Sequence, residues 1–309
     1  MVKDGNIWVI LNPTAGKGKA EKLQAKIEKI LSGSGRRFQI HATKAPGHAI
    51  EIVHTLPIKD NDVTVAAGGD GTCNEVVNGL LTRRPRSANA PLFGIIPIGR
   101  GNDFSSTPQI PEDVDKACEI ILNEKVSSLD VGFVKGGFFP EGRYFVNGIG
   151  IGFDAKVGFE AAKMKIKNGS SYTLGALITL VKYEKSPVVN MKYDDKEVTL
   201  ASVIISIVNG RRMGGSFYMG PNALLDDGLF DICYVRHQEK RSQLLNIFNH
   251  YTKGTQSECE GVYTDKAAKF HLKALEGSMA AHCDGETVCY EGKELEIICN
   301  PGALRLIGA

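Results

Sequence analysis

Long apolar runs are missing from this sequence of 309 residues. No stretch reaches the roughly 20 residues that an apolar helix needs to span a bilayer, and the run at 7–11 is too short for a cleaved leader. Any contact with lipid is therefore expected to be peripheral. The sequence also lacks a large excess of positive or negative charge. The formal net charge of +2 argues against a nucleic-acid partner held by bulk electrostatics.

Paired cysteine motifs are also absent. The seven cysteines are scattered and odd in number, and no two of them form a CxxC pair. We therefore expect neither a disulfide framework nor a zinc site, and a reducing cytoplasm is the expected location. The 42% hydrophobic and 23% charged residues are typical of a globular protein, and the length favours two domains. The sequence leaves open whether the protein forms a homodimer.

The first 128 residues alternate between apolar strand-like runs and helical patterns. The strand-like runs cover 7–11, 38–42, 63–67 and 92–97, and the helical patterns cover 20–31, 48–56, 74–81 and 114–122. Apolar strands separated by helices indicate a parallel sheet that is covered on both faces. We predict an α/β fold whose residues 1–128 form a doubly wound, parallel-sheet domain.

Residues 129–309 have a different sequence pattern, with many short β-like runs that are separated by Gly, Asn and Asp. Such spacing predicts a β-rich, sandwich-like second domain. Helical patterns interrupt it at 155–167, 172–183 and 242–249. The C-terminal segment of this domain could return toward the first.

The motif GGDGT at 68–72 lies between an apolar run and an amphipathic stretch, so it predicts a strand, a glycine turn and a helix start. Glycines let backbone amides approach a phosphate, and a helix beginning near Thr72 or Cys73 favours an anion there. Asp70 within such a turn favours a magnesium-bearing nucleotide over a bare phosphate. The alternative is a glycine turn with a solvent-facing Asp70.

Polar loops at 12–19, 43–47 and 99–103 also follow predicted strands. Ligands of parallel sheets bind beyond the carboxyl ends of the strands, so we expect the four loops to converge on one crevice. The first loop, NPTAGKG from Asn12, does not have the spacing of a Walker A motif.

The last of these loops belongs to the motif IPIGRGNDF, which begins at Ile96. Arg100 could reach a phosphate as a planar donor. Asn102 and Asp103 could equally cap the next segment.

Two Asp-Gly turns stand out in the second half of the chain. The motif HCDGE at 282–286 contains Asp284, which by itself indicates an ordinary hairpin turn. The motif LLDDGL at 224–229 by itself indicates a solvated β-turn, although hard oxygen ligands on a tight turn suit Mg²⁺.

Taken in order, the motifs of the chain resemble the lipid-kinase family that contains the bacterial diacylglycerol kinases and, more distantly, the sphingosine kinases. The resemblance spans nearly the whole chain, and GGDGT alone is shared with NAD kinases and phosphofructokinases. The motifs that carry it are NPTAGKG at Asn12, ATKAPGHA at Ala42, GGDGTCNEVVNG at Gly68, IPIGRGNDF at Ile96, LDVG at Leu129, LLDDGLFD at Leu224 and HCDGE at His282.

The resemblance implies ATP and Mg²⁺ as cofactors. The residues implied to contact ATP are Asn12, Pro13, Thr14, Ala15, Gly16, Thr43, Gly68, Gly69, Asp70, Gly71, Thr72, Cys73, Asn74, Glu75 and Arg100. The family usually has threonine where this chain has Arg100, a departure that puts this one contact in question.

The resemblance further implies that Asp284 is the general base, because a carboxylate accepts the hydroxyl proton in phosphoryl transfer. It implies a structural Mg²⁺ held by the side chain of Asp227 and the main-chain carbonyls of Leu224 and Leu229. Asp130, together with Asp70, is a further acidic candidate near ATP. A strand-edge carboxylate is the alternative for Asp130.

We therefore expect an ATP-dependent lipid kinase that transfers the γ-phosphate to a hydroxyl of diacylglycerol or a related lipid. One alternative is a kinase of a soluble hydroxyl compound such as NAD, which GGDGT alone would support. The other is a non-catalytic nucleotide-binding regulatory protein, for which Arg100 is the one hint.

A lipid substrate implies peripheral membrane contact. Basic clusters at 83–86 and 211–212, and lysines at 156, 163, 165 and 167, could meet anionic headgroups. The apolar-rich stretch 172–181 could contact an acyl chain. Solvated surface for the basic clusters and a buried helix for the apolar stretch are the alternatives.

Overall fold

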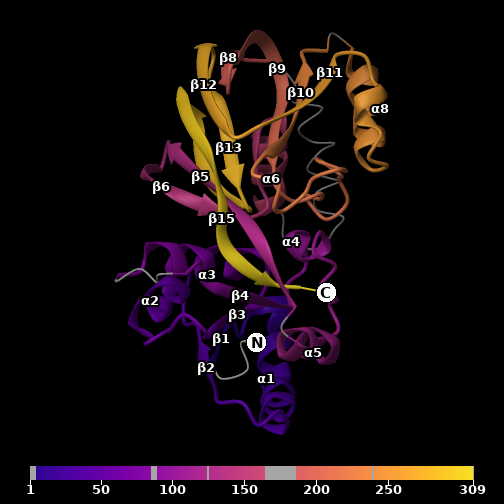
Figure 1. The fold of residues 1–309 in the computed structure, drawn as a ribbon. Helices are drawn as coiled ribbons and strands as arrows, with labels where there is room; N and C mark the ends of the chain where they lie inside the picture. The colour runs from indigo at the N-terminus through magenta and orange to yellow at the C-terminus, as the bar shows by residue number, and fades with distance from the viewer. Residues whose placement is uncertain (1–4, 85–88, 124, 164–185, 239, 309) are drawn as a thin grey trace. The chain divides into compact units, whose positions relative to one another are not determined.

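The computed structural model describes residues 5–84, 89–123, 125–163, 186–238 and 240–308 (Figure 1). The chain divides into two compact units. The first contains Met1–Val131 and Pro301–Ala309, and the second contains Gly132–Asn300.

The first unit alternates strands and helices in chain order, and β1, β3 and β4 are buried along their whole length. Its elements are β1 (Ile7–Leu11), α1 (Ala15–Gly33), β2 (Phe38–Ala42), α2 (His48–Thr55), β3 (Val63–Gly68), α3 (Asp70–Thr82), β4 (Leu92–Pro97), α4 (Asp103–Ser106) and α5 (Val114–Asn123). The strand order is β2-β1-β3-β4, and each neighbouring pair is parallel. Helix α1 packs on α5, and α2 packs on α3. The predicted doubly wound parallel sheet is confirmed.

The second unit is rich in strands that pair antiparallel. Its elements are β5 (Val126–Gly136), which begins in the first unit, β6 (Phe139–Phe145), β7 (Gly148–Gly152), α6 (Phe153–Lys163), β8 (Val188–Tyr193), β9 (Lys196–Val208), β10 (Phe230–Arg236), α8 (Arg241–Tyr251), β11 (Val262–Ala267), β12 (Lys269–Glu276), β13 (Met279–Cys283), β14 (Glu286–Gly292) and β15 (Glu294–Ile307). The expected β-rich second domain is confirmed.

Strand β15 belongs to both units. Its first part pairs antiparallel with β12, with Phe270 opposite Ile297. Its last part pairs parallel with β4 of the first unit, with Arg305 opposite Leu92. The parallel sheet of the first unit is therefore completed by residues from the far end of the chain.

Two apolar clusters stabilise the second unit. One lies between the strands and includes Phe145, Ile207 and Leu272. The other lies where α6 and α8 pack on the sheet and includes Phe153 and Ile247. The second cluster borders the pocket described below.

Helices α2 and α5 begin at the predicted residues 48 and 114, whereas α3 begins earlier than predicted. The start of α3 was expected near residue 72, but the helix begins at Asp70 because Gly69 is extended (φ −101°, ψ −170°) and acts as its N-cap. An acidic residue in the first helical turn is stabilised by the helix dipole. The helix expected at 172–183 lies outside the described residues, and within them no helix is long and apolar enough to cross a bilayer.

Candidate functional site

The first glycine loop follows β1 directly. The side-chain Oδ1 of Asn12 accepts hydrogen bonds from the Thr14 amide (3.1 Å) and the Thr14 hydroxyl (2.9 Å), and its Nδ2 donates to Thr72 Oγ1 (3.3 Å). Asn12 therefore connects the first loop to the start of α3. Pro13 and Ala15, on either side of Thr14, are half-buried.

Left-handed backbone interrupts the start of α1. Gly16, Lys17 and Gly18 have φ values of 59°, 63° and 83°, so the regular helix begins only after them. A Cβ on Gly16 would lie 2.5 Å from the carbonyl oxygen of Ile98, at the end of β4. The position therefore requires glycine for both its backbone conformation and its close approach to a neighbouring loop.

The loops after β3 and β4 touch through their main chains. The carbonyl of Gly68 accepts hydrogen bonds from the amides of Ile98 (2.7 Å) and Gly99 (3.1 Å). A Cβ on Gly99 would lie 2.5 Å from Cα of Gly69, so side chains cannot be placed between the two loops. Three of the four predicted loops are thus brought together by backbone at the carboxyl end of the sheet.

Asp70 faces the loop after β4. Its Oδ1 accepts a hydrogen bond from the amide of Phe104 (3.2 Å), and a Cβ on Gly101 would lie 3.1 Å from its Oδ2. Arg100, on the same loop, is exposed. Asp70 is half-buried and lies close to the segment that carries Arg100.

Glu75 holds the second loop. Its two carboxylate oxygens accept hydrogen bonds from the amides of Gly47 (2.8 Å) and Ala49 (3.1 Å), at the N-terminus of α2. Thr43, at the start of that loop, donates its amide to the carbonyl of Leu11 (2.8 Å). The carboxylate of Glu75 thus caps α2.

The first turn of α3 is largely buried. Thr72 is 6% exposed, Cys73 4% and Asn74 0%, whereas Gly71 is half-buried. Asn78 donates to the side-chain oxygen of Asn74 (3.2 Å), one turn away. A ligand at this edge would meet the main chain of this turn, because these side chains point into the core.

Asp130 is buried and acts within the first unit. It is 1% exposed, and its Oδ1 accepts a hydrogen bond from the amide of Gly302 (2.8 Å). The carboxylate therefore binds the main chain of the last part of β15.

Asp284 lies in the tight turn between β13 and β14, with a φ of 48°. Its Oδ1 accepts hydrogen bonds from the amides of Asn147 and Gly148 (both 3.0 Å), and its Oδ2 accepts one from the amide of Val146 (2.8 Å). The residue is 9% exposed. Both carboxylate oxygens thus accept hydrogen bonds from the main chain just before β7 and at its first residue.

The turn expected to hold a structural Mg²⁺ is contacted by a lysine of β11. The Nζ of Lys266 lies 2.7 Å from Asp227 Oδ2 and 3.1 Å from Asp231 Oδ2, and Asp227 Oδ1 accepts the amide of Leu229 (3.1 Å). Burial raises the pKa of Asp231, and the hydrogen bond from Lys266 opposes this shift. Leu224 is 47% exposed.

A metal ion at this turn would compete with Lys266 for Asp227, so the donor set fits a structural Mg²⁺ poorly while the lysine is in place. Among the residues that the structure describes, no three His, Cys, Asp or Glu side chains cluster as metal ligands. The ligand set of Leu224, Asp227 and Leu229 stays a prediction.

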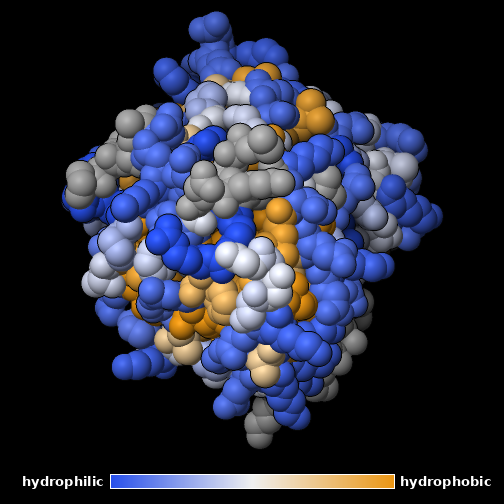
Figure 2. All heavy atoms as spheres, turned by 60° about the horizontal axis from the view of Figure 1, so that its bottom comes forward, coloured by the Kyte–Doolittle hydropathy of each residue, from blue (hydrophilic) through white to orange (hydrophobic). Residues whose placement is uncertain are grey.

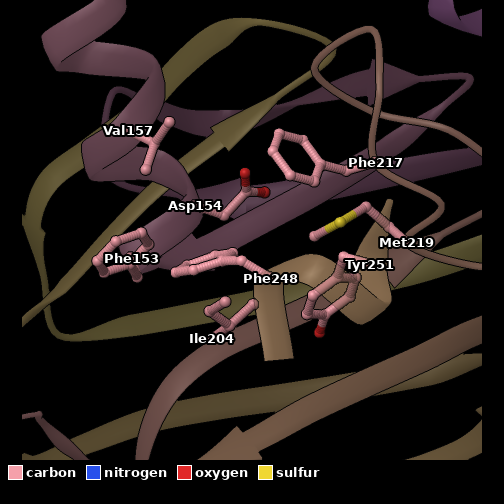
Figure 3. Close-up of a pocket in the computed structure, with 8 residues that line it drawn as sticks. All are labelled: Phe153, Asp154, Val157, Ile204, Phe217, Met219, Phe248 and Tyr251. Atoms are coloured by element: carbon pink, nitrogen blue, oxygen red, sulfur yellow. The ribbon is translucent and has the colours of Figure 1, made fainter. Parts of the chain in front are cut away.

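A small, partly open pocket lies between α6, β9 and α8 of the second unit (Figure 3). Asp154 is the charged residue among its eight lining side chains, and Figure 3 shows its carboxylate among aromatic and apolar groups. The lining residues are Phe153, Asp154, Val157, Ile204, Phe217, Met219, Phe248 and Tyr251. The pocket thus places one charged acceptor among apolar side chains.

The sequence analysis did not single out Asp154, and it named His282 only as the first residue of the HCDGE motif. His282 Nε2 lies 3.2 Å from Asp154 Oδ2, although the two residues are 128 positions apart. The sequence feature that indicates this contact is the run Gly-Ile-Gly-Ile-Gly at 148–152. Glycine at every second position leaves one face of a strand without side chains, which indicates a close approach.

The basic clusters expected at a membrane are partly described. Arg211 Nε donates to the carbonyl of Ala223 (3.2 Å), and the guanidinium of Arg212 lies 5.6 Å from the centre of the Tyr218 ring. Both arginines thus contact neighbouring groups of the second unit. Figure 2 shows hydrophilic residues over most of the surface in that view, with a smaller group of hydrophobic residues among them. Residues 85–86, the stretch 172–181 and the side chains at 163, 165 and 167 lie outside the described residues.

Two family profiles match the chain. The diacylglycerol kinase catalytic domain matches residues 6–134, and the YegS C-terminal NAD kinase beta sandwich-like domain matches residues 147–308. Together they define a two-part enzyme class, with an α/β catalytic domain followed by a β-sandwich-like domain.

Individual proteins agree with the two profiles. A diacylglycerol kinase of Bacillus subtilis is 28% identical over 281 residues, which covers 90% of this chain and 88% of that protein. A YegS-like lipid kinase of Chromohalobacter salexigens is 28% identical over 238 residues, covering 76% of this chain and 72% of its own. A crystal structure assigned as a Bacillus anthracis diacylglycerol kinase superposes with a TM-score of 0.80 at 25% identity, covering 99% of this chain and 96% of that one.

The chain belongs to the diacylglycerol kinase catalytic-domain family. It is accordingly a phosphotransferase that acts on an alcohol group.

Proposed function

We propose that this chain is an ATP-dependent lipid kinase that transfers the γ-phosphate of ATP to a hydroxyl of diacylglycerol or a related glycerolipid. The match of the two family profiles to the two parts of the chain carries this proposal. In the second unit, apolar side chains surround Asp154, whose carboxylate can accept a hydrogen bond from a hydroxyl. The names of the relatives, which specify diacylglycerol and lipid, support the same acceptor class.

The glycine loops of the first unit support the nucleotide half of the proposal. The loops after β1, β3 and β4 meet through main-chain atoms, and α1 and α3 begin there. Backbone amides and helix starts without an intervening Cβ are suited to phosphates. We infer that residues 12–16 and 68–74 contact ATP chiefly through their backbone. Arg100 supplies an exposed cation on the same edge.

Magnesium bound with ATP would neutralise the negative charge that develops on the transferred phosphoryl group. Asp70 is suited to hold it, because a carboxylate is a hard oxygen ligand and Asp70 lies where the glycine loops meet.

In the proposed reaction the acceptor oxygen forms a bond to the γ-phosphorus, and the bond from this phosphorus to the bridging oxygen of ADP breaks. The hydroxyl proton passes to a carboxylate, for which we propose Asp284. The three amide contacts of Asp284 fix the orientation of its carboxylate, which favours a positioned base over a mobile one.

The proposal is tested by incubating the purified protein with labelled ATP, Mg²⁺ and vesicles of extracted total lipid, and by identifying labelled products by mass. A glycerolipid that gains one phosphate is the expected product. Transfer only to soluble acceptors such as NAD, without vesicles or detergent, would show a soluble-substrate kinase instead. ATP binding with no transfer to any lipid or soluble acceptor would show a regulatory nucleotide-binding protein.

A diacylglycerol substrate resides in a bilayer, so we also infer peripheral contact with the cytoplasmic membrane surface. Sedimentation with vesicles that contain anionic lipid measures this contact. An electrostatic component predicts release at high salt.

A further inference from the structure

A lysine joins two acidic side chains beside the turn at 224–229. Strands β10 and β11 are antiparallel neighbours, and Asp231 lies directly opposite Lys266 in their register. Directly opposite residues of an antiparallel pair have their side chains on the same face of the sheet, so the strand pairing itself places the ammonium group beside Asp231. Lys266 Nζ lies 3.1 Å from Asp231 Oδ2 and 2.7 Å from Asp227 Oδ2.

The three charged groups are shielded from solvent over most of their surface. The side chains of Lys266, Asp227 and Asp231 are 35%, 22% and 18% exposed. Two carboxylates that are this close to a common point would repel each other and would lose part of their hydration, so their ionised forms need a cation between them. The ammonium group of Lys266, which contacts both, is that cation.

The remaining contacts of Asp227 differ from those of a metal ligand. Its other carboxylate oxygen, Oδ1, accepts the amide N–H of Leu229 (3.1 Å), whereas the expected metal site would use the Leu229 carbonyl. Both oxygens of Asp227 therefore have donors within the protein. A divalent ion bound at Oδ2 would also meet the positive charge of Lys266 Nζ, which is 2.7 Å from the same oxygen.

We propose that Lys266 takes the place of the structural cation at this turn. Its ammonium group neutralises Asp227 and Asp231 and connects the turn to β11, so the turn keeps its conformation without a bound metal ion. The inference replaces the structural Mg²⁺ that the resemblance implied for this turn. It does not depend on the proposed function, and it does not concern the magnesium that accompanies ATP.

Thermal unfolding without nucleotide tests whether a metal ion supports the turn. The Tm of the wild-type protein is expected to agree within about 1 °C between millimolar EDTA and millimolar MgCl₂, because an ion that does not bind the folded state cannot stabilise it. A resident structural ion predicts instead a Tm that falls in EDTA. A fall that Asp227→Asn abolishes would overturn the inference, since the ion and not the lysine would then hold the turn.

Substitutions at Lys266 test whether the turn requires its charge. Lys266→Met removes the charge and is expected to lower Tm in EDTA by about 2–4 °C, and Mg²⁺ is expected to restore part of this loss. Lys266→Arg keeps a cation and should remain near the wild-type Tm with little response to Mg²⁺. Lys269→Met is the matched control, because Lys269 is an exposed lysine on β12, the next strand along the chain. Equal Tm values for Lys266→Met and Lys269→Met would overturn the inference.

Direct metal binding gives a second readout that needs no ATP. Mn²⁺, which also prefers oxygen ligands, is titrated into each protein and followed by electron paramagnetic resonance. The wild-type protein and Asp227→Asn are expected to bind the same number of ions. Lys266→Met is expected to gain one site, which the additional change Asp227→Asn removes.

Two results of this titration would overturn the inference. One is a wild-type site that Asp227→Asn removes, and the other is no added site in Lys266→Met, because the ammonium group would then not stand where a divalent ion can bind. If Lys266→Met does not fold, the wild-type protein, Lys266→Arg and Asp227→Asn decide the question. Absence of lipid phosphorylation would overturn the proposed function alone, since neither Tm nor Mn²⁺ binding requires turnover.

Discussion

Replacing Asp284 with Asn should destabilise the second unit, whatever its effect on catalysis. The wild-type carboxylate accepts three main-chain hydrogen bonds, from Val146, Asn147 and Gly148, and is almost fully buried. An asparagine side chain has one acceptor oxygen and an NH₂ group. If its oxygen keeps the two bonds to Asn147 and Gly148, its NH₂ group faces the amide of Val146, and two donors then oppose each other.

The magnitude follows from these contacts. A buried amide left without an acceptor costs roughly 1–3 kcal/mol, and two bonds that lose a charged acceptor cost about 0.5–1 kcal/mol each. The total loss is about 2–5 kcal/mol. At roughly 2–4 °C per kcal/mol for a unit of this size, Tm should fall by about 4–20 °C.

Thermal unfolding followed by circular dichroism measures the effect, and ATP binding shows whether the first unit stays folded. Asp195→Asn is the matched control, because Asp195 is an exposed aspartate in the turn between β8 and β9. A Tm for Asp284→Asn within 1 °C of wild type would refute the account of this turn. A large fall in Tm would mean that lost activity alone cannot identify Asp284 as the base, so turnover must be compared at temperatures where both proteins are folded.

Three further outcomes are expected. Gly99→Ala should lower ATP affinity and Tm together, because its Cβ would lie 2.5 Å from Cα of Gly69, and unchanged ATP binding by calorimetry would contradict the packing of the two loops. Lys266→Met should lower Tm by about 2–4 °C, because roughly 1 kcal/mol of ion pairing is lost. If millimolar Mg²⁺ raises the Tm of this variant again, the freed carboxylates can hold the ion. Of the seven thiols, Cys259 alone is not buried, so a thiol reagent at pH 8 should label one cysteine in the native protein and seven in urea. Burial raises the pKa of Cys233 to about 11, so rapid native labelling of that thiol would contradict its environment.

The first unit could be predicted from the sequence because its strands are apolar throughout and its helices separate them. The expected ranges of β1, β2 and β4 agree with the structure to the residue. The four-residue helix α4 was missed, since so short a helix has no periodic pattern. Strand β7 has no clear β pattern in the sequence, because three of its five residues are glycine.

The candidate site was harder to predict than the fold. Local motifs identified the glycine loops, since the need for glycine there is a property of short backbone segments. The capping of α2 by Glu75 and the contact of Asp154 with His282 join residues that are far apart in sequence. The contact of Glu75 has no local signal, and for the contact of Asp154 with His282 the glycines at 148–152 indicate a close approach without naming the partners. Both contacts depend on how helices and strands pack. Lys266 is a third case, because the sequence gives no sign that its ammonium group reaches Asp227.

The shared strand β15 has a consequence for anyone who divides this protein into pieces. A fragment that stops at residue 131 would lack the segment that pairs with β4, leaving that edge of its sheet open to self-association. Dissecting the nucleotide-binding half therefore calls for a spliced gene that joins residues 301–309 to the fragment through a short linker.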